Sequence, residues 1–260
     1  MSRHEVAISA ELLEQALSSV AADAVLVGGQ ALAVWVSHYG LNASVELEPG
    51  VPISLDADFL GQRVDVDSIA KKVRGKALFP AQRAITALVG QIEVSTGESE
   101  YVNIDVIHRV VGLEPDEIRR RASSLTWGDV CFQVMHPLDV LASRVENLKQ
   151  LADKQNADGA AQARLAVLVA REYVLERLSD GDEKIALKAI ERIATIAKSA
   201  AGRTASRDYG VDFRVGIPAD AVKNEAFRNQ RFPRLREELA HAAGLARSAN
   251  LAPQEKKANQ

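Results

Sequence analysis

Two carboxylates inside one apolar run constrain this 260-residue chain more than any other feature. In Ile53–Leu60 the acids are Asp56 and Asp58. Side chains alternate between the faces of a β-strand, so the pattern predicts both acids on one face. The residues predicted to face packed helices on the other side are Leu55, Ala57 and Phe59. Buried acids are costly unless neutralised, and Mg²⁺ or Mn²⁺ prefers oxygen ligands. The pair therefore indicates either a metal site or a strand end with two solvated aspartates.

The segment before this pair has a pattern suited to phosphate binding. Ala24–Val27 is predicted to be a short buried strand, and Gln30–Val36 an apolar helix, with Gly28 and Gly29 between them. Glycine allows close approach to the main chain, and a helix N-terminus offers free N–H groups. The glycine pair is equally consistent with a simple tight turn.

A third acid lies in a later strand. Tyr101–Ile107 alternates in polarity and carries Asp105 near its middle, although strand interiors are depleted in aspartate. Gln91–Thr96 precedes it across a short glycine-containing loop, which predicts a hairpin. Asp105 is therefore expected beside the strand of Asp56 and Asp58. The alternative is an edge-strand charge that discourages aggregation.

Taken in order, these elements resemble the nucleotidyltransferase superfamily, which has a DNA polymerase β-like fold. Leu26–Leu32 and Ser54–Phe59 resemble the AbiEii-type group of toxin-like nucleotidyltransferases, and the resemblance covers roughly residues 20–150. By this resemblance, Asp56, Asp58 and Asp105 would be the catalytic, metal-binding acids. The nucleotide phosphates would face Gly28 and Gly29, with Arg144 and Lys154 as candidate basic residues. Two further nucleotide-binding candidates are named by their position: Gln30, which follows the glycine pair, and Arg63, which lies just beyond the strand of Asp58 and is otherwise a solvated surface residue.

The chain departs from that group at two places. The stretch between Gly29 and Asp56 is longer than in compact members, because a turn-rich loop from His38 to Pro52 is inserted. The late Arg/Lys-Asp-x-x-Asp helix has only a loose counterpart in Asp153–Asp158. The basic residue for the triphosphate is therefore expected to be Arg144 or Lys154, and each could also be an ordinary surface charge.

The fold class expected is α+β. A small mixed β-sheet nucleotidyltransferase domain with flanking helices would span residues 1–136, an all-helical C-terminal domain residues 137–250, and a disordered tail residues 251–260. The boundary rests on Pro137, after which apolar residues recur at helical spacing. Predicted helices cover residues 9–17, 68–74, 115–122, 137–151, 160–178, 182–200, 219–227 and 233–247.

Several local patterns have simpler explanations. A second Asp-x-Asp, at Asp65 and Asp67, is attributed to capping of the helix that follows. Three arginines within Pro115–Ala122 indicate a solvated face or, alternatively, a surface for RNA or nucleotide. Val130–Met135 is predicted to be a strand with Cys131 as a core thiol.

Composition bears on the binding partners of the chain and on the cellular compartment that suits it. The formal net charge is −3, so the chain as a whole is no obvious polyanion binder. A single cysteine excludes an intramolecular disulfide and suits a reducing cytoplasm. No apolar run approaches the roughly 20 residues of a membrane span, so no membrane association is expected.

The function expected is transfer of a nucleoside monophosphate from a nucleoside triphosphate to an acceptor hydroxyl on RNA, protein or a small molecule. The resemblance also implies the toxin-like component of a toxin–antitoxin or phage-defence system, with an antitoxin-like partner protein. Two alternatives stay open. One is a catalytically degenerate binding protein with this fold, and the other is an Asp-x-Asp glycosyltransferase that uses a nucleotide-sugar.

Overall fold

A mixed β-sheet forms one side of the molecule. The computed structural model describes residues 3–41 and 53–244. Within them the sheet has eight strands: β1 (His4–Glu5), β2 (Val25–Val27), β3 (Ala57–Leu60), β4 (Lys76–Leu78), β5 (Leu88–Ser95), β6 (Glu100–Ile107), β7 (Ser123–Trp127) and β8 (Val130–Val134). Their order is β4-β5-β6-β3-β2-β8-β7, with β1 beside β6. The pairs β3–β6, β2–β8 and β1–β6 are parallel and the others antiparallel. The α+β class with a mixed sheet is confirmed.

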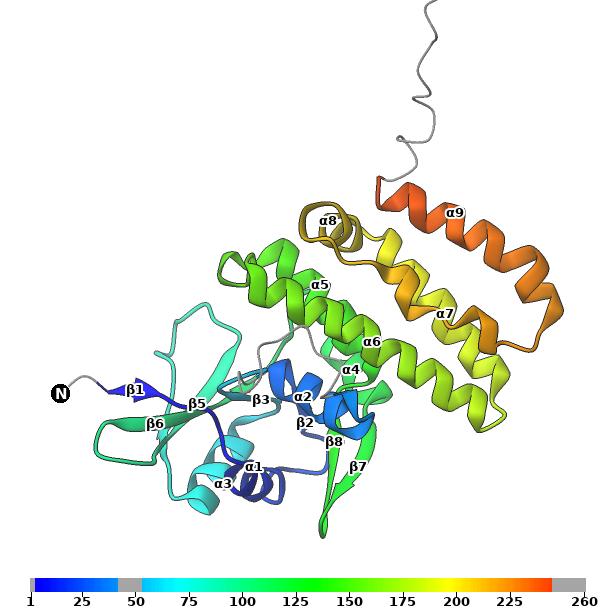
Figure 1. The fold of residues 1–260 in the computed structure, drawn as a ribbon. Coiled ribbons are helices and arrows are strands. Elements are labelled where there is room, and N and C mark those ends of the chain that lie inside the picture. Colours follow the sequence, from blue (N-terminus) through cyan, green and yellow to red (C-terminus); the bar gives the residue numbers. More distant parts are fainter. Residues whose placement is uncertain (1–2, 42–52, 245–260) are drawn as a thin grey trace, which may run out of the picture.

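Helices flank the sheet and then build the rest of the chain (Figure 1). They are α1 (Ala10–Leu17), α2 (Gly28–His38), α3 (Arg63–Val73), α4 (Pro115–Arg121), α5 (Pro137–Gln150), α6 (Ala157–Ser179), α7 (Glu183–Lys198), α8 (Ala200–Tyr209) and α9 (Phe232–Ala242). Short 3₁₀ turns cover Ala152–Lys154, Phe213–Gly216 and Ala219–Ala221, and a π-helical turn covers Phe227–Arg231. Helix α2 contacts both α5 and α6, so it lies where the sheet meets the later helices.

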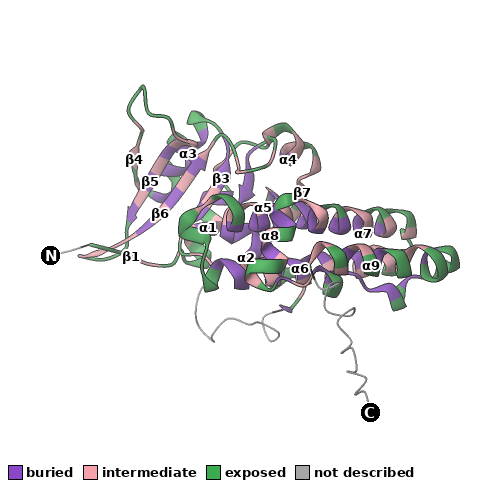
Figure 2. Cartoon of the chain, turned by 90° about the horizontal axis from the view of Figure 1, so that it is seen from above, coloured by how far each residue is buried: buried purple, intermediate pink, exposed green. Residues whose placement is uncertain are grey.

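One hydrophobic cluster runs through both halves of the chain. It includes Phe59 and Ile104 from the sheet, Leu32 from α2, and Leu141 and Ile190 from the later helices, all fully buried. In Figure 2, residues coloured as buried occur both in the strands of the sheet and along the long helices α6 and α7. The change from strands to helices occurs where β8 ends at Val134 and α5 begins at Pro137. The predicted change of pattern is thus present, but the core continues across it.

The pleat of β6 follows the predicted alternation. Val102, Ile104 and Val106 are buried, and α3 packs against β5 and β6. Asn103 and Asp105 point to the opposite face and are half-buried. The apolar half of the pattern therefore fixes which way Asp105 points.

Three predictions about the sheet are wrong in detail. Asp56 precedes β3 instead of lying within it, because regular pairing begins at Ala57. Leu55 is 42% exposed and is no packing residue. Cys131 is exposed, because Phe132 and Val134 occupy the buried face of β8 and Cys131 alternates to the other one.

Among the helices, the prediction over residues 219–227 is wrong. The stretch begins with a 3₁₀ turn at Ala219–Ala221, residues 222–224 have no regular structure, and helical turns resume only at residue 225. Helix α8 was not predicted as a separate element, and Ser199 caps its start by accepting from the N–H of Gly202. Helix α3 begins at Arg63, earlier than predicted, with a capping box formed by Gln62 and Asp65.

The arginines of α4 are held in ion pairs. Arg119 pairs with Asp116, while Arg120 and Arg121 both pair with Glu117. They therefore do not present an uncompensated basic surface. Most of the inserted loop, residues 42–52, and the C-terminal tail lie outside the described residues.

Candidate functional site

Strand order and register bring the predicted site residues together. Val27, the last residue of β2, pairs with Asp58 on β3, and Asp58 pairs with Asp105 on β6. Helix α2 begins directly after Val27. The start of α2 and two of the three acids therefore form one row across neighbouring strands.

Gly28 lies against the carboxylate of Asp58. Its φ is +68°, and a Cβ built on it would be 1.9 Å from Asp58 Oδ2. At Gly29 a Cβ would be 2.3 Å from Ser54 Oγ. Side chains are excluded at both positions, so the main chain at the start of α2 approaches the acids closely. The first N–H groups of a helix have no partner within that helix and favour anions.

Asp58 is crowded by negative charge. Burial raises its pKa to about 7, and the neighbouring Asp56 and Asp105 add to this shift. The charges of Arg144 and Lys154 act in the opposite direction. The three acids are thus close enough to repel one another, and both basic candidates are close enough to attract Asp58.

The other two acids are held by neutral donors. Ser54 Oγ donates to Asp56 Oδ1 at 2.7 Å, and Gln91 Nε2 donates to Asp105 Oδ1 at 3.0 Å. Burial also raises the pKa of Asp105; the bond from Gln91 lowers it, and Asp56 and Glu5 raise it further. Each carboxylate thus has one oxygen in a defined hydrogen bond.

Arg144 is a buried cation, not a surface charge. Its side chain comes from α5, and the residue is 7% exposed. Its Nη1 donates to Gln162 Oε1 at 3.1 Å and Nη2 to Ser143 Oγ at 3.4 Å. Within residues 3–41 and 53–244, Nε is buried without a hydrogen-bond partner. Burial lowers the pKa of Arg144, while Asp58 and Asp56 raise it. Buried arginines are normally paired, so this one is available to a ligand anion.

The acids suit a hard cation by chemistry, but they are not arranged as a finished metal site. In the part of the chain that the structure describes, no group of three or more His, Cys, Asp or Glu side chains could hold a metal ion as it stands. Because Asp56 and Asp105 each hydrogen-bond to a local donor, we infer that convergence on a cation requires side-chain rotation. Burial is the main cause of the raised pKa of Asp58, and a bound cation would relieve the repulsion from Asp56 and Asp105 that adds to it.

The remaining predicted nucleotide-binding residues are placed differently. Gln30 is buried, and its Nε2 donates to the carbonyl of Ser54 at 3.1 Å. Lys154 lies in the 3₁₀ turn after α5 and pairs with Asp153 at 3.3 Å. Arg63 is not brought to the site, since it follows the other end of β3.

Beyond the far end of β3, the guanidinium carbon of Arg63 stacks 3.9 Å from the centre of the Phe79 ring. Sequence reasoning missed Gln91 and Gln162. The hairpin register could have placed Gln91 opposite Asp105, but no local pattern marks Gln162.

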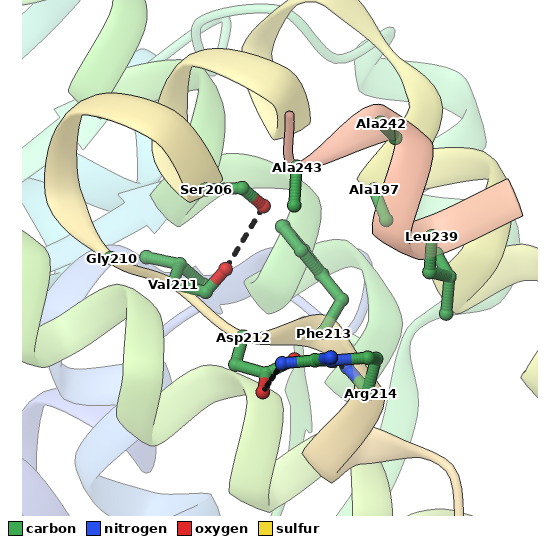
Figure 3. A pocket seen from close by; sticks show the side chains of 10 residues that line it. All are labelled: Ala197, Ser206, Gly210, Val211, Asp212, Phe213, Arg214, Leu239, Ala242 and Ala243. Atoms are coloured by element: carbon green, nitrogen blue, oxygen red, sulfur yellow. Dashed lines mark hydrogen bonds and ion pairs between the residues drawn. The ribbon is translucent and has the colours of Figure 1, made fainter. Parts of the chain in front are cut away.

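A separate cavity lies between the later helices (Figure 3). It has a volume of about 270 Å³ and an apolar wall that includes Phe213 and Leu239. Its polar groups are satisfied internally, because Ser206 Oγ donates to the carbonyl of Val211 and Arg214 pairs with Asp212. It therefore offers weaker ligand chemistry than the row of acids beside α2.

Comparisons with known proteins add no family assignment. No family model matches the chain, and no curated protein is significantly similar to it. None of the described helices is long and apolar enough to cross a membrane. The geometry at α2, β3 and β6 is therefore the main structural evidence about function.

Proposed function

We propose that this protein is a metal-dependent nucleotidyltransferase that moves a nucleoside monophosphate from a nucleoside triphosphate to an acceptor hydroxyl. The observation that carries the proposal is the contact between the start of α2 and the acid row. Gly28 lies against Asp58, Asp58 is paired with Asp105, and the charge of Arg144 acts on Asp58. A helix N-terminus open to an approaching anion, neighbouring carboxylates and a buried cation thus meet at one place.

The phosphates would be bound by chain groups of two kinds. The free N–H groups at the start of α2 would hold phosphate oxygens, which the glycines leave room to approach. Arg144 would neutralise the triphosphate from α5, with Lys154 supporting it from the following turn. Because Arg144 has no carboxylate partner among the contacts described, binding a phosphate does not require breaking an ion pair.

The acids would hold cations and accept a proton. Asp56, Asp58 and Asp105 would bind Mg²⁺ or Mn²⁺, which when bound supplies positive charge for the entering and leaving oxygens. Asp105 would accept the proton of the acceptor hydroxyl through its Oδ2, since Gln91 occupies Oδ1. The acceptor oxygen then attacks the α-phosphorus, the bond to the β-phosphate oxygen breaks, and pyrophosphate leaves.

A catalytically degenerate binding protein is the second candidate. It is favoured by one observation, that the described acids do not form a ready ligand group. Such a protein would bind the triphosphate without releasing pyrophosphate. Acceptors for the active form would be RNA, protein or a small molecule, and a toxin-like role with an antitoxin-like partner rests on the motif resemblance.

Titration calorimetry with each of the four nucleoside triphosphates and Mg²⁺ tests the nucleotide site. We expect wild type and Asp67→Asn, a control at an exposed acid of α3, to bind one or more of them, and Asp56→Asn to lose that binding. Equal binding by Asp56→Asn would contradict the proposed site. Pyrophosphate release on addition of acceptor candidates then separates the enzyme from the degenerate protein.

A further inference from the structure

Two glutamine side chains hold consecutive carbonyls just before β3. Gln30, from α2, donates to the carbonyl of Ser54 at 3.1 Å. Gln162, from α6, donates to the carbonyl of Ile53 through Nε2 at 2.8 Å. The segment that leads to Asp56 is therefore anchored from the sheet half and from the helical half of the chain.

Gln162 also contacts the buried cation. Its Oε1 accepts from Arg144 Nη1 at 3.1 Å, so the two ends of one amide connect α5 with the segment before Asp56. A primary amide can do this because it carries a donor and an acceptor together. Among the described residues, Gln162 is the one hydrogen-bond partner of the Arg144 side chain that lies outside α5.

We propose that Gln162 is a positioning residue that fixes Arg144 relative to the Ile53–Asp56 segment and thereby sets the triphosphate site. The proposal rests on the proposed function for the ligand, but the side-chain geometry stands without it. Gln162 orients the groups that would touch the nucleotide and touches no reacting atom itself.

Neutrality of residue 162 is central to this role. A carboxylate at this position would pair with Arg144 and cancel the positive charge that a phosphate needs. The amide accepts one hydrogen bond without placing a further negative charge beside the guanidinium. Nε of Arg144 also stays without a partner among the described residues, so donor capacity remains for a ligand. Gln162 thus holds Arg144 in place without neutralising it.

The test uses Mg²⁺ and inorganic tripolyphosphate as the probe, since it carries no base. Calorimetry compares wild type with Gln162→Leu, Gln162→Glu and the control Gln150→Leu, whose exposed side chain hydrogen-bonds, within the described part of the chain, only to Glu146 on the same helix. We expect about tenfold weaker binding for Gln162→Leu, a larger loss for Gln162→Glu and no change for the control. A residue with only a packing role would give similar losses for the leucine and glutamate variants.

A ligand-free measurement makes the proposal independent of binding. Phenylglyoxal modification of Arg144, followed by mass spectrometry, reports how firmly the guanidinium is held. We expect modification several-fold faster in Gln162→Leu than in wild type or Gln150→Leu. Should Gln162→Leu fail to fold, Gln162→Asn replaces it, because the shorter amide cannot reach both partners.

The outcomes separate the two proposals. An unchanged modification rate in the folded variant overturns the positioning role, whatever binds. Faster modification with no tripolyphosphate or nucleotide binding by wild type overturns the nucleotide site and supports the positioning role. Faster modification together with the graded loss of binding supports both.

Discussion

Two buried charged regions of this protein are built in opposite ways. Asp139 on α5 is fully buried and accepts two bonds from Arg121, at 2.9 and 3.0 Å, and one from Arg192. Five residues further along the same helix, Arg144 is buried, and its hydrogen-bond partners among the described residues are neutral. The charge of Arg144 lowers the pKa of Asp58, whereas burial and the neighbouring Asp56 and Asp105 raise it.

The difference shows where the fold compensates its own charges. Removing an ion from water costs several kcal/mol unless partners replace the lost hydration. Around Asp139 the partners belong to α4 and α7, so the ion pairs connect helices. Around Asp58 and Arg144 the charges are left partly uncompensated, which is what the proposed binding of cations and phosphates would require.

The largest effect is expected from breaking the compensated region. Asp139→Asn removes the charge that Arg121 and Arg192 share, and leaves both cations near the core without their common partner. We expect the free energy of unfolding to fall by about 3–5 kcal/mol. Urea denaturation measures it, with Asp153→Asn as an exposed control. A loss below about 1 kcal/mol would show that the two regions do not differ in this way.

The next effect concerns the main chain at the site. Gly28→Ala places a methyl carbon 1.9 Å from Asp58 Oδ2 and forces a non-glycine residue to φ +68°. We expect a loss of about 2–3 kcal/mol in the free energy of unfolding, together with loss of Mg²⁺-triphosphate binding. Gly40→Ala is a useful control, since it shares a positive φ but has open space around it. Similar losses at both positions would mean that strain alone acts.

Neutralising Asp58 is expected to stabilise the ligand-free protein. Its pKa is raised to about 7 in the folded state from an ordinary 3.8. Between these pH values Asp58 is ionised in the unfolded chain but still largely protonated in the folded protein, so the stability of the fold decreases as the pH rises. At pH 8 we expect Asp58→Asn to gain about 2 kcal/mol in the free energy of unfolding, and below pH 4 nothing. Thermal unfolding across pH 4–8 checks this. A variant that is less stable than wild type at pH 8 would contradict it.

The smallest change in stability is expected at Arg144. Arg144→Met keeps much of the side-chain volume and removes a buried charge whose hydrogen-bond partners among the described residues are neutral, so the free energy of unfolding should change by less than about 1 kcal/mol. Triphosphate affinity should nevertheless fall about tenfold or more. Calorimetry with Mg²⁺ and the triphosphate bound by wild type measures this. A large stability loss with unchanged affinity would assign Arg144 to the structural class of Asp139.

Local sequence patterns predicted much of the backbone structure around the candidate site. The sequence Val27-Gly28-Gly29 correctly indicated a strand that turns directly into a helix, because strand residues and glycine turns have short-range requirements. Alternation along Tyr101–Ile107 correctly placed Asp105 opposite its apolar neighbours. The same reasoning failed for Cys131, since a strand pattern does not say which of two faces is covered.

The sequence by itself determined the order of elements and the residues that could bind phosphate or cations, because helix and strand periodicities depend on neighbours a few positions apart. Only the tertiary structure decided that Arg144 is buried near Asp58, that Asp139 is compensated, and that Gln162 reaches the carbonyl of Ile53. The last contact joins residues 109 positions apart. Such partners are set by how helices pack on the sheet, and no local spacing encodes them.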